Sequence, residues 1–343
     1  MIKCVVWDLD GTIWDGILSE NWDVHLFLGI HKVIQKLDQC GILQTIASRN
    51  NESLVNKKLT ELGIRSYFVL SQCNWGSKTD SLKRISDKLN ISLDSLVFID
   101  NDPFELYEVN VYLPQVKTLN ASDFDHLLEL TRSEEERSEE TSQRRELIKL
   151  KLVRDEFESA FIGSREDFLK SCEMKLNVHL AKDKDVPRIF ELSRRTNQLN
   201  NLSEKVSLAT VQGYLKLPNK ICYVSELSDR FGYHGLIGVC FLTKEEGHVN
   251  IDLFCISCRV EGRGVGTGFL YEVIHQIQEN WPNVSTVKVK YQMTIKNLPA
   301  KILLELVGFK AIKKKGNEVL YELPLPHVQS MPDWIEVNRI NRQ

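Results

Sequence analysis

The chain has 343 residues, of which 42% are hydrophobic and 27% charged, and its formal net charge is -3. These values are typical of a globular protein large enough for two cores, and the lack of a basic excess argues against a nucleic-acid-binding protein. No apolar run is long enough to cross a bilayer, and Met1–Asp10 has no signal-peptide pattern. Among the eight cysteines only Cys255 and Cys258 are spaced C-x-x-C, so we expect thiols in a reducing cytoplasm rather than a zinc site.

Short apolar segments alternate with amphipathic segments up to about residue 131. This alternation predicts an α/β domain over residues 1–131, with a doubly wound parallel sheet and its chemistry at the carboxyl ends of the strands. The predicted strands are Lys3–Trp7, Leu43–Ala47, Tyr67–Leu70 and Leu96–Ile99. The predicted helices are Ile30–Cys40, Glu52–Leu62 and Thr79–Leu89.

The composition changes after residue 131. Arg132–Arg145 is rich in Glu, Arg and Ser, and Leu147–Phe161 returns to helical spacing. We therefore expect a charged linker and a connecting helix over residues 132–172, since a charge run is usually a solvated face.

The pattern over residues 173–325 predicts a second domain of the α+β class with a mostly antiparallel sheet, followed by a C-terminal tail over residues 326–343. Its strands are expected at Lys175–Leu180, Ile221–Glu226, Gly235–Leu242, Val249–Ile256, Val284–Lys290, Phe309–Ile312 and Val319–Glu322. Its helices are expected at Val186–Thr196, Thr267–Asn280 and Lys296–Leu306.

The first predicted strand ends in two carboxylates, in the run D-L-D-G-T from Asp8 to Thr12. Residues i and i+2 of an extended strand point to the same face, so Asp8 and Asp10 converge where the strand stops. Beside a Mg²⁺ ion, one carboxylate can attack phosphorus while the other moves the proton of the leaving oxygen. The alternative is an ordinary Asp-Gly turn, but the position directly behind a buried strand favours phosphoryl chemistry.

Polar residues also follow or adjoin the other predicted strands. Ser48 follows Leu43–Ala47, and Lys78 immediately precedes a predicted helix, where a cation and a helix N-terminus both suit a phosphate. Asp100 begins an acidic strand end suited to Mg²⁺. As alternatives, Ser48 could be a helix cap, Lys78 a surface lysine, and the segment from Asp100 a simple turn. Their shared position at strand ends favours one phosphoryl-transfer site.

This order of motifs resembles the haloacid-dehalogenase (HAD) superfamily of phosphotransferases. The resemblance implies that Asp8 is the nucleophile, which forms an aspartyl-phosphate, and that Asp10 is the general acid/base. It also implies that Thr12, Ser48 and Lys78 hold the phosphoryl group.

The same resemblance implies a Mg²⁺ cofactor, held by the Asp8 carboxylate, the Asp10 backbone carbonyl and Asp100. Members of the superfamily often have two adjacent acids at this last motif. Here Asn101 follows Asp100, which leaves the role of Asp102 open.

A glycine-rich loop from Arg259 to Gly266 lies between a predicted strand and a predicted helix. Glycines let the backbone approach a ligand closely, and N–H groups at a helix start can cradle a phosphate. The loop resembles that of GNAT acyltransferases, which bind coenzyme A or a carrier-protein arm. The resemblance implies a pantetheine site at Arg259, Gly262, Arg263 and Gly264.

Cys258 directly precedes this loop, where a strand end would face the thioester of a bound arm. Arg259 and Arg263 would favour its thiolate, and a buried apolar cysteine is the alternative. Cys73, near the first site, is the rival nucleophile. Leu304 stands where GNAT enzymes often have a tyrosine that protonates the departing thiolate, so acyl transfer through an enzyme thiol is favoured.

The two halves in this order resemble the FkbH-like family over nearly the whole chain. The matching pieces are K-C-V-V-W-D-L-D-G-T from Lys3, W-D-G from Trp14, N-W-G-S-K from Asn74, F-I-D from Phe98, P-F-E from Pro103, T-N-Q-x-N from Thr196 and S-C-R-V-x-G-R-G from Ser257.

The FkbH-like resemblance implies a glyceryl transferase/phosphatase acting on 1,3-bisphosphoglycerate in the cytoplasm. An enzyme cysteine would capture the acyl group, and the HAD site would remove the remaining phosphate. The glyceryl group would then pass to the pantetheine thiol of an acyl carrier protein, as in polyketide biosynthesis. Thr196, Asn197 and Gln198 are candidate ligands for the glyceryl hydroxyls, with a helix C-cap as the alternative.

Two other classes of protein remain open. One is a HAD phosphatase whose second domain only binds a partner. The other is an enzyme whose GNAT-like domain acylates an amino-sugar or another amine acceptor from acyl-CoA.

Overall fold

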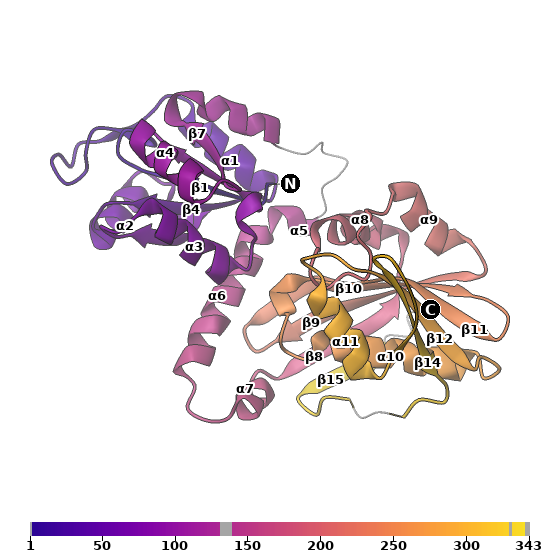
Figure 1. The fold of residues 1–343 in the computed structure, drawn as a ribbon. Helices are drawn as coiled ribbons and strands as arrows, with labels where there is room; N and C mark the ends of the chain where they lie inside the picture. Colours follow the sequence, from indigo (N-terminus) through magenta and orange to yellow (C-terminus); the bar gives the residue numbers. More distant parts are fainter. Residues whose placement is uncertain (1, 131–138, 329–330, 340–343) are drawn as a thin grey trace. The chain divides into compact units, whose positions relative to one another are not determined.

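The computed structural model describes residues 2–130, 139–328 and 331–339. The chain divides into two compact units, Met1–Leu152 and Val153–Gln343 (Figure 1). The boundary falls inside helix α6 (Arg144–Ala160). The presence of this helix confirms the one predicted over Leu147–Phe161. Residues 131–138 of the predicted charged linker lie outside the described residues, and the short helix α5 (Glu139–Ser142) follows them.

The first unit is built on a five-stranded, fully parallel sheet with the order β5-β4-β1-β6-β7. This order confirms the predicted α/β class, and each of the four predicted strands is present. The strand β7 was not predicted because it is a short, largely polar segment at the sheet edge. The strands are β1 (Cys4–Trp7), β4 (Leu43–Ser48), β5 (Phe68–Cys73), β6 (Leu96–Asp100) and β7 (Lys117–Asn120).

Alternate residues of β1 face opposite sides of this sheet, and helices cover both sides. Val5 and Trp7 belong to the core that includes residues of α1 and α2, whereas Cys4 and Val6 belong to the core that includes residues of α3 and α4. All four β1 residues are fully buried, as expected for a central parallel strand. The helices are α1 (Ile30–Gln39), α2 (Glu52–Glu61), α3 (Lys78–Leu89) and α4 (Pro103–Tyr112).

Helix α4 and a small hairpin were not predicted from the sequence. The Asp102 carboxylate caps α4 by accepting the Phe104 N–H at 2.9 Å, and Pro103 occupies the first helical turn. The acidic segment after β6 is therefore both a strand end and a helix start. The hairpin pairs β2 (Trp14–Asp15) with β3 (His25–Leu26) just after the D-L-D-G-T segment.

The second unit is built on an eight-stranded sheet with the order β13-β14-β12-β11-β10-β9-β8-β15. Its neighbours are antiparallel except for the pairs β11–β12 and β15–β8, which confirms the predicted α+β class. The strands are β8 (Met174–Leu180), β9 (Lys220–Asp229), β10 (Gly232–Lys244), β11 (His248–Ile256), β12 (Thr286–Gln292), β13 (Lys310–Lys315), β14 (Glu318–Pro324) and β15 (Ile335–Arg339).

Helices cover both faces of this second sheet as well. Val224 and Cys255 lie in the core that includes residues of α8 and α9, and Leu242 and Ile251 lie in the core that includes residues of α10 and α11. Helix α9 was not predicted, since Gly213 weakens its helical pattern. The helices are α7 (Arg165–Ser171), α8 (Val186–Arg195), α9 (Leu208–Lys216), α10 (Val265–Asn280) and α11 (Leu298–Val307).

The segment expected to be a C-terminal tail contributes β15 to the sheet. This strand pairs in parallel with β8, with Ile335 opposite Met174. Ile335 is buried, and the neighbouring Trp334 donates its Nε1–H to the Arg263 carbonyl at 2.9 Å. A short edge strand of this kind gives little periodic signal in the sequence. Across the described ranges, the structure contains no helix with the length and apolarity to span a membrane.

Candidate active sites

Asp8 lies at the carboxyl end of β1, in a cavity of about 380 Å³ in the first unit. Its backbone N–H donates to the Ile99 carbonyl of β6 at 2.9 Å, and the residue is 7% exposed. Gly11 adopts a φ of 69°, and a Cβ there would lie 2.5 Å from Asn101 Nδ2. The turn that follows Asp8 therefore requires glycine.

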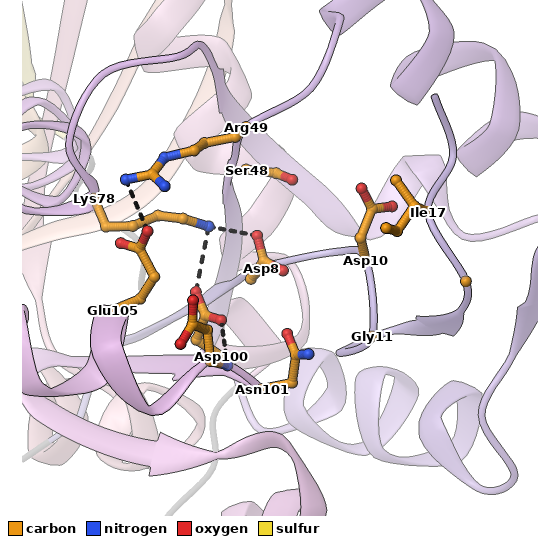
Figure 2. A pocket seen from close by; sticks show the side chains of 12 residues that line it. Asp8, Asp10, Gly11, Ile17, Ser48, Arg49, Lys78, Asp100, Asn101 and Glu105 are labelled. Atoms are coloured by element: carbon orange, nitrogen blue, oxygen red, sulfur yellow. Dashed lines mark hydrogen bonds and ion pairs between the residues drawn. The ribbon is translucent and has the colours of Figure 1, made fainter. Parts of the chain in front are cut away.

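Five of the residues predicted from the sequence line this one cavity (Figure 2). They come from four segments that are distant in the chain, and the parallel sheet brings those segments to the same edge. The five are Asp8, Asp10, Ser48, Lys78 and Asp100.

Lys78 is the buried cation of the cavity. It is the first residue of α3, whose N-cap is Ser77. Its Nζ donates to the Asp8 carboxylate and to the Ala47 carbonyl at 2.7 Å, and it lies 3.3 Å from Asp100 Oδ2 (Figure 2). One lysine thus bridges two carboxylates at the start of a helix, where a phosphoryl group would also be attracted.

Both of these carboxylates are harder to ionise than usual. Burial raises the pKa of Asp8 to about 7, while Lys78 opposes the rise and the Asp100 charge adds to it. Burial also raises the pKa of Asp100, again opposed by Lys78. Two buried carboxylates that share one lysine carry excess negative charge when both are ionised, so the site favours a further cation.

Asp10 is held by three hydrogen bonds. One carboxylate oxygen accepts the Trp14 Nε1–H at 2.7 Å and the Leu18 N–H at 3.1 Å. The other accepts the Asn50 Nδ2–H at 2.8 Å. These donors fix the orientation of the carboxylate at the cavity wall, as a general acid/base requires.

The end of β4 contributes Ser48 and an ion pair that was not predicted. Ser48 is buried against the cavity, and Arg49 beside it lies 2.7 Å from Glu105, a residue of the first turn of α4 (Figure 2). The Glu105 side chain is 5% exposed. Arg49 adjoins the predicted Ser48, which is a usable signal in the sequence. Nothing in the sequence places Glu105 beside it, because their contact depends on how α4 packs.

Thr12 and Asp102 are engaged in the loops around the cavity. The Thr12 hydroxyl donates to Asn101 Oδ1 at 3.3 Å and accepts the Asn101 N–H at 3.1 Å. Thr12 thus braces the loop after β6 and is not among the residues that line the cavity. Asp102 lines the cavity while one of its oxygens caps α4.

The donor set at this site fits Mg²⁺. Among the residues that the structure describes, no group of three or more His, Cys, Asp or Glu side chains is already placed to hold a metal ion, and Lys78 lies between the Asp8 and Asp100 carboxylates. Carboxylates are nevertheless the hard oxygen ligands that Mg²⁺ prefers. Asp100 Oδ2 is buried and pairs with the Lys78 ammonium group at 3.3 Å, so this carboxylate oxygen still has a lone pair for a metal ion.

Mg²⁺ is expected to stabilise the chain against unfolding. At a concentration of about 100 times its Kd, the free energy of unfolding should rise by roughly 3 kcal/mol. Asp100→Asn should abolish the rise, whereas Asp102→Asn should retain it because asparagine still caps α4. Urea unfolding with and without Mg²⁺ measures this, and an unchanged response in Asp100→Asn would remove Asp100 from the ligand set.

The glycine-rich loop of the second unit borders a mostly apolar cavity of about 430 Å³. Gly262 and Gly264, both with positive φ, lie on its wall directly before helix α10, together with Thr267. The remaining wall is contributed mainly by apolar residues, Leu199, Val260, Pro299, Ile302, Leu303 and Leu306. An elongated arm with an apolar body and an anionic end suits such a cavity at a helix N-terminus.

The two predicted pantetheine-binding arginines do not line this cavity. Arg263 is buried and lies 3.6 Å from Asp155. Arg259 donates to the Ser257 hydroxyl and to the His234 carbonyl, both at 3.3 Å. The structure therefore brings Gly262 and Gly264 to the cavity, and it turns the Arg263 side chain to helix α6 and the Arg259 side chain to Ser257 and strand β10.

Burial disfavours the thiolate form of two cysteines near the candidate sites, Cys73 and Cys255. Cys258 is half-buried at the first turn after β11. Burial raises the pKa of Cys73 to about 12, with the Glu52 charge adding to the rise, and burial likewise raises that of Cys255 to about 12. Cys73 and Cys255 are therefore poor nucleophiles near neutral pH.

The predicted glyceryl ligands lead into a segment, Leu199–Ser203, that we call the wedge. Strands β11 and β12 pair only as far as Ile251 and Val289, and the wedge fills the gap beyond. Asn201 donates its N–H to Phe254 O at 3.2 Å, and its carbonyl accepts the Gln292 N–H at 2.8 Å.

Thr196, Asn197 and Gln198 lie between α8 and the wedge. Thr196 is buried and its hydroxyl is hydrogen-bonded to Cys255, whereas Asn197 and Gln198 are half-buried. None of the three lines the apolar cavity, but the next residue, Leu199, does.

The fold and the two sites define the class of this protein. An α/β unit with a lysine-bridged pair of carboxylates in its cavity precedes an α+β unit with a glycine-lined, mostly apolar cavity. No protein-family model and no curated protein matches this chain.

Three solved structures illustrate its similarities to known proteins. The N-terminal part of protein BF1531 from Bacteroides fragilis, which contains a phosphatase domain and is complexed with Mg, is 28% identical with a TM-score of 0.35, over 38% of this chain and 41% of that one. The ribosomal-protein-S18-alanine N-acetyltransferase from Escherichia coli is 12% identical with a TM-score of 0.35, over 45% of this chain and 96% of that one. An acetyltransferase from Thermus thermophilus is 21% identical with a TM-score of 0.35, and the match covers 45% of this chain and 99% of that one.

Proposed function

We propose that this protein is a glyceryl transferase/phosphatase. It would capture the acyl group of 1,3-bisphosphoglycerate on Cys258, remove the remaining phosphate at Asp8, and transfer the glyceryl group to the pantetheine thiol of an acyl carrier protein. The observation that supports this most is the presence, in one chain, of the buried Asp8–Lys78–Asp100 arrangement and of a glycine-lined apolar cavity. The half-buried Cys258 does not line that cavity, but it lies two residues before Val260 of its wall.

In the phosphatase half of the reaction, Asp8 attacks the phosphorus atom of the phosphoglyceryl group. The bond from phosphorus to the glyceryl oxygen breaks, and Asp10 donates a proton to that oxygen. Water then attacks the aspartyl-phosphate, Asp10 accepts its proton, and inorganic phosphate leaves. Lys78 and Ser48 bind the phosphoryl oxygens. Asp8, Asp100 and the Asp10 carbonyl would hold Mg²⁺, which neutralises phosphoryl charge when bound.

In the acyl half, the Cys258 sulfur attacks the carbonyl carbon of the acyl phosphate. A carbon–sulfur bond forms, the carbon–oxygen bond to phosphate breaks, and the thiol proton leaves with inorganic phosphate. The pantetheine thiol later attacks this thioester and returns a proton to the Cys258 sulfur. An acyl phosphate is an activated donor, so no further energy source is required.

Acylation of an amine from acyl-CoA is the second candidate function. It needs a group that protonates the departing thiolate, and Leu304, at the position where a tyrosine would stand, is 1% exposed within the apolar core. This residue supplies no acid, which favours the thiol-based reaction.

Cys258→Ala should separate the two half-reactions. Incubated with 1,3-bisphosphoglycerate, Mg²⁺ and a holo acyl carrier protein, the variant should form no acyl-enzyme and add no glyceryl mass to the carrier. It should still hydrolyse a simple phosphomonoester at the wild-type rate, because Asp8 and Cys258 lie in different units. Intact-protein mass spectrometry and phosphate release measure the two activities.

Cys73→Ala is the matched control, and it should retain the acyl-enzyme. If the wild-type chain adds no glyceryl mass to the carrier, the proposed function is wrong. If Cys73→Ala instead abolishes the acyl-enzyme, the nucleophile has been assigned to the wrong cysteine.

A further inference from the structure

The wedge brings Asn197 and Cys258 to the same end of a paired segment. Asn200 forms an antiparallel bridge with Cys255, and the Ile256 N–H donates to the Leu199 carbonyl at 2.9 Å. Because the two segments are antiparallel, Asn197, which precedes the wedge, and Cys258, which follows β11, lie at the same end of this pairing. Asn197 and Cys258 are thus each three residues from the Asn200–Cys255 bridge, on the same side of it.

A lysine is fixed against the residues that enter the wedge. Lys205 Nζ donates to Asn197 Oδ1 at 2.8 Å and to the Thr196 carbonyl at 3.4 Å. Within the described residues, this ammonium group forms no ion pair with a carboxylate. The Lys205 charge lowers the pKa of the buried Cys255 thiol, and a charge on Cys258 raises it. Lys205 and Cys258 therefore both lie within electrostatic range of Cys255.

The charges of two further cations, Arg194 and Lys296, act on Lys205. Although the Lys205 side chain is partly exposed, partial desolvation lowers its pKa, a Cys255 thiolate opposes this, and the Arg194 and Lys296 charges add to the lowering. Arg194 is in the last turn of α8, and Lys296 precedes Asn297, whose Nδ2 donates to the Asn200 carbonyl at 3.1 Å. Cations from three chain segments therefore raise the positive potential at the Lys205 ammonium group, which favours an anion there.

We propose that Lys205, with Arg194 and Lys296, forms an anion-binding site beside Cys258 that receives the phosphate of the acyl-phosphate donor. The proposal rests on the proposed function and extends it to the group that leaves. As the Cys258 sulfur bonds to the carbonyl carbon, the carbon–oxygen bond breaks and its electron pair goes to the phosphate oxygen. That phosphate departs with the thiol proton, and Lys205 stabilises its charge by a charge-assisted hydrogen bond.

Protection of Cys258 from alkylation by inorganic phosphate tests this site. The full chain is treated with iodoacetamide across a phosphate titration, and peptide mass spectrometry follows labelling at Cys258. Phosphate should slow the labelling of the wild-type chain. In Lys205→Met the apparent phosphate affinity should fall about tenfold or more, since a hydrogen bond to a charged group is lost. Lys205→Arg should restore protection.

Lys184→Met is the matched control and should behave as wild type. Lys184 is an exposed lysine of the same unit, and it precedes α8 in the sequence whereas Lys205 follows it. The anion site is refuted if phosphate does not slow Cys258 labelling in the wild-type chain, or if it protects Lys205→Met equally well. If phosphate protection depends on Lys205 but a carrier protein gains no glyceryl mass, the anion site stands and the proposed transfer reaction fails.

Discussion

Asp8→Asn is expected to abolish phosphate removal while leaving acyl capture intact. Loss of the attacking carboxylate should lower phosphomonoesterase activity on the order of 10³-fold or more. The acyl-enzyme formed from 1,3-bisphosphoglycerate should then retain its phosphate, which intact-mass spectrometry distinguishes from the dephosphorylated form. Asparagine has nearly the same shape as aspartate, so the β1 end and its bond to Ile99 should be preserved.

The matched control for this variant is Asp15→Asn, which changes an exposed aspartate of the neighbouring hairpin. It should keep full activity. Wild-type phosphatase activity in Asp8→Asn would remove Asp8 from the role of nucleophile and would leave Asp10 and Asp100 as the carboxylates to test.

Lys78→Met is expected to destabilise the first unit in a manner that depends strongly on pH. Without the lysine, two buried carboxylates lose their shared cation, which should cost about 3–5 kcal/mol of unfolding free energy when both are ionised. Measured by urea unfolding without Mg²⁺, the loss should be large above pH 8 and much smaller near pH 5. Phosphatase activity should be lost as well.

The sign follows from the raised pKa of Asp8. A carboxyl group with a higher pKa in the folded chain binds its proton more tightly there, so the stability that it contributes is complete below the unfolded value of about 4. This stability is lost as pH rises through the folded value of about 7. Removing Lys78 raises the pKa further and enlarges the loss.

Lys83→Met serves as the control, since Lys83 is a surface lysine of the same helix, 3.7 Å from Asp80. Its effect should stay within about 0.5 kcal/mol at either pH. An equal loss of stability at pH 5 and pH 8 in Lys78→Met would mean that the lysine acts by packing, and not by charge.

The two sites place different demands on their surroundings. At the first, Arg49 and Glu105 form an ion pair on the cavity wall, and the Glu105 pKa is raised by burial although Arg49 opposes the rise. At the second, the wall is mostly apolar, and charge is supplied by the loops around Cys258. A phosphoryl group fits the first environment, and a long thiol-bearing arm fits the second.

The sequence alone was enough to predict which polar residues lie at the carboxyl edge of the first sheet. Asp8, Ser48, Lys78 and Asp100 each adjoin a strand end or a helix start, and parallel strands bring such ends to one edge. Periodicity also determined both fold classes, because the apolar runs are long and regular. It failed for β7 and β15, which are short, for α4, whose apolar residues do not follow one helical face, and for α9, which Gly213 interrupts.

Only the tertiary structure decided which predicted side chains reach a cavity. Arg259 and Arg263 adjoin the glycine loop in sequence, yet their side chains bind the neighbouring His234 carbonyl and Asp155. Lys205 gave no signal, because its approach to Asn197 depends on the wedge between two diverging strands. Local patterns determine where strands and helices end, since their energetics are local, whereas the direction of a side chain depends on contacts between distant segments.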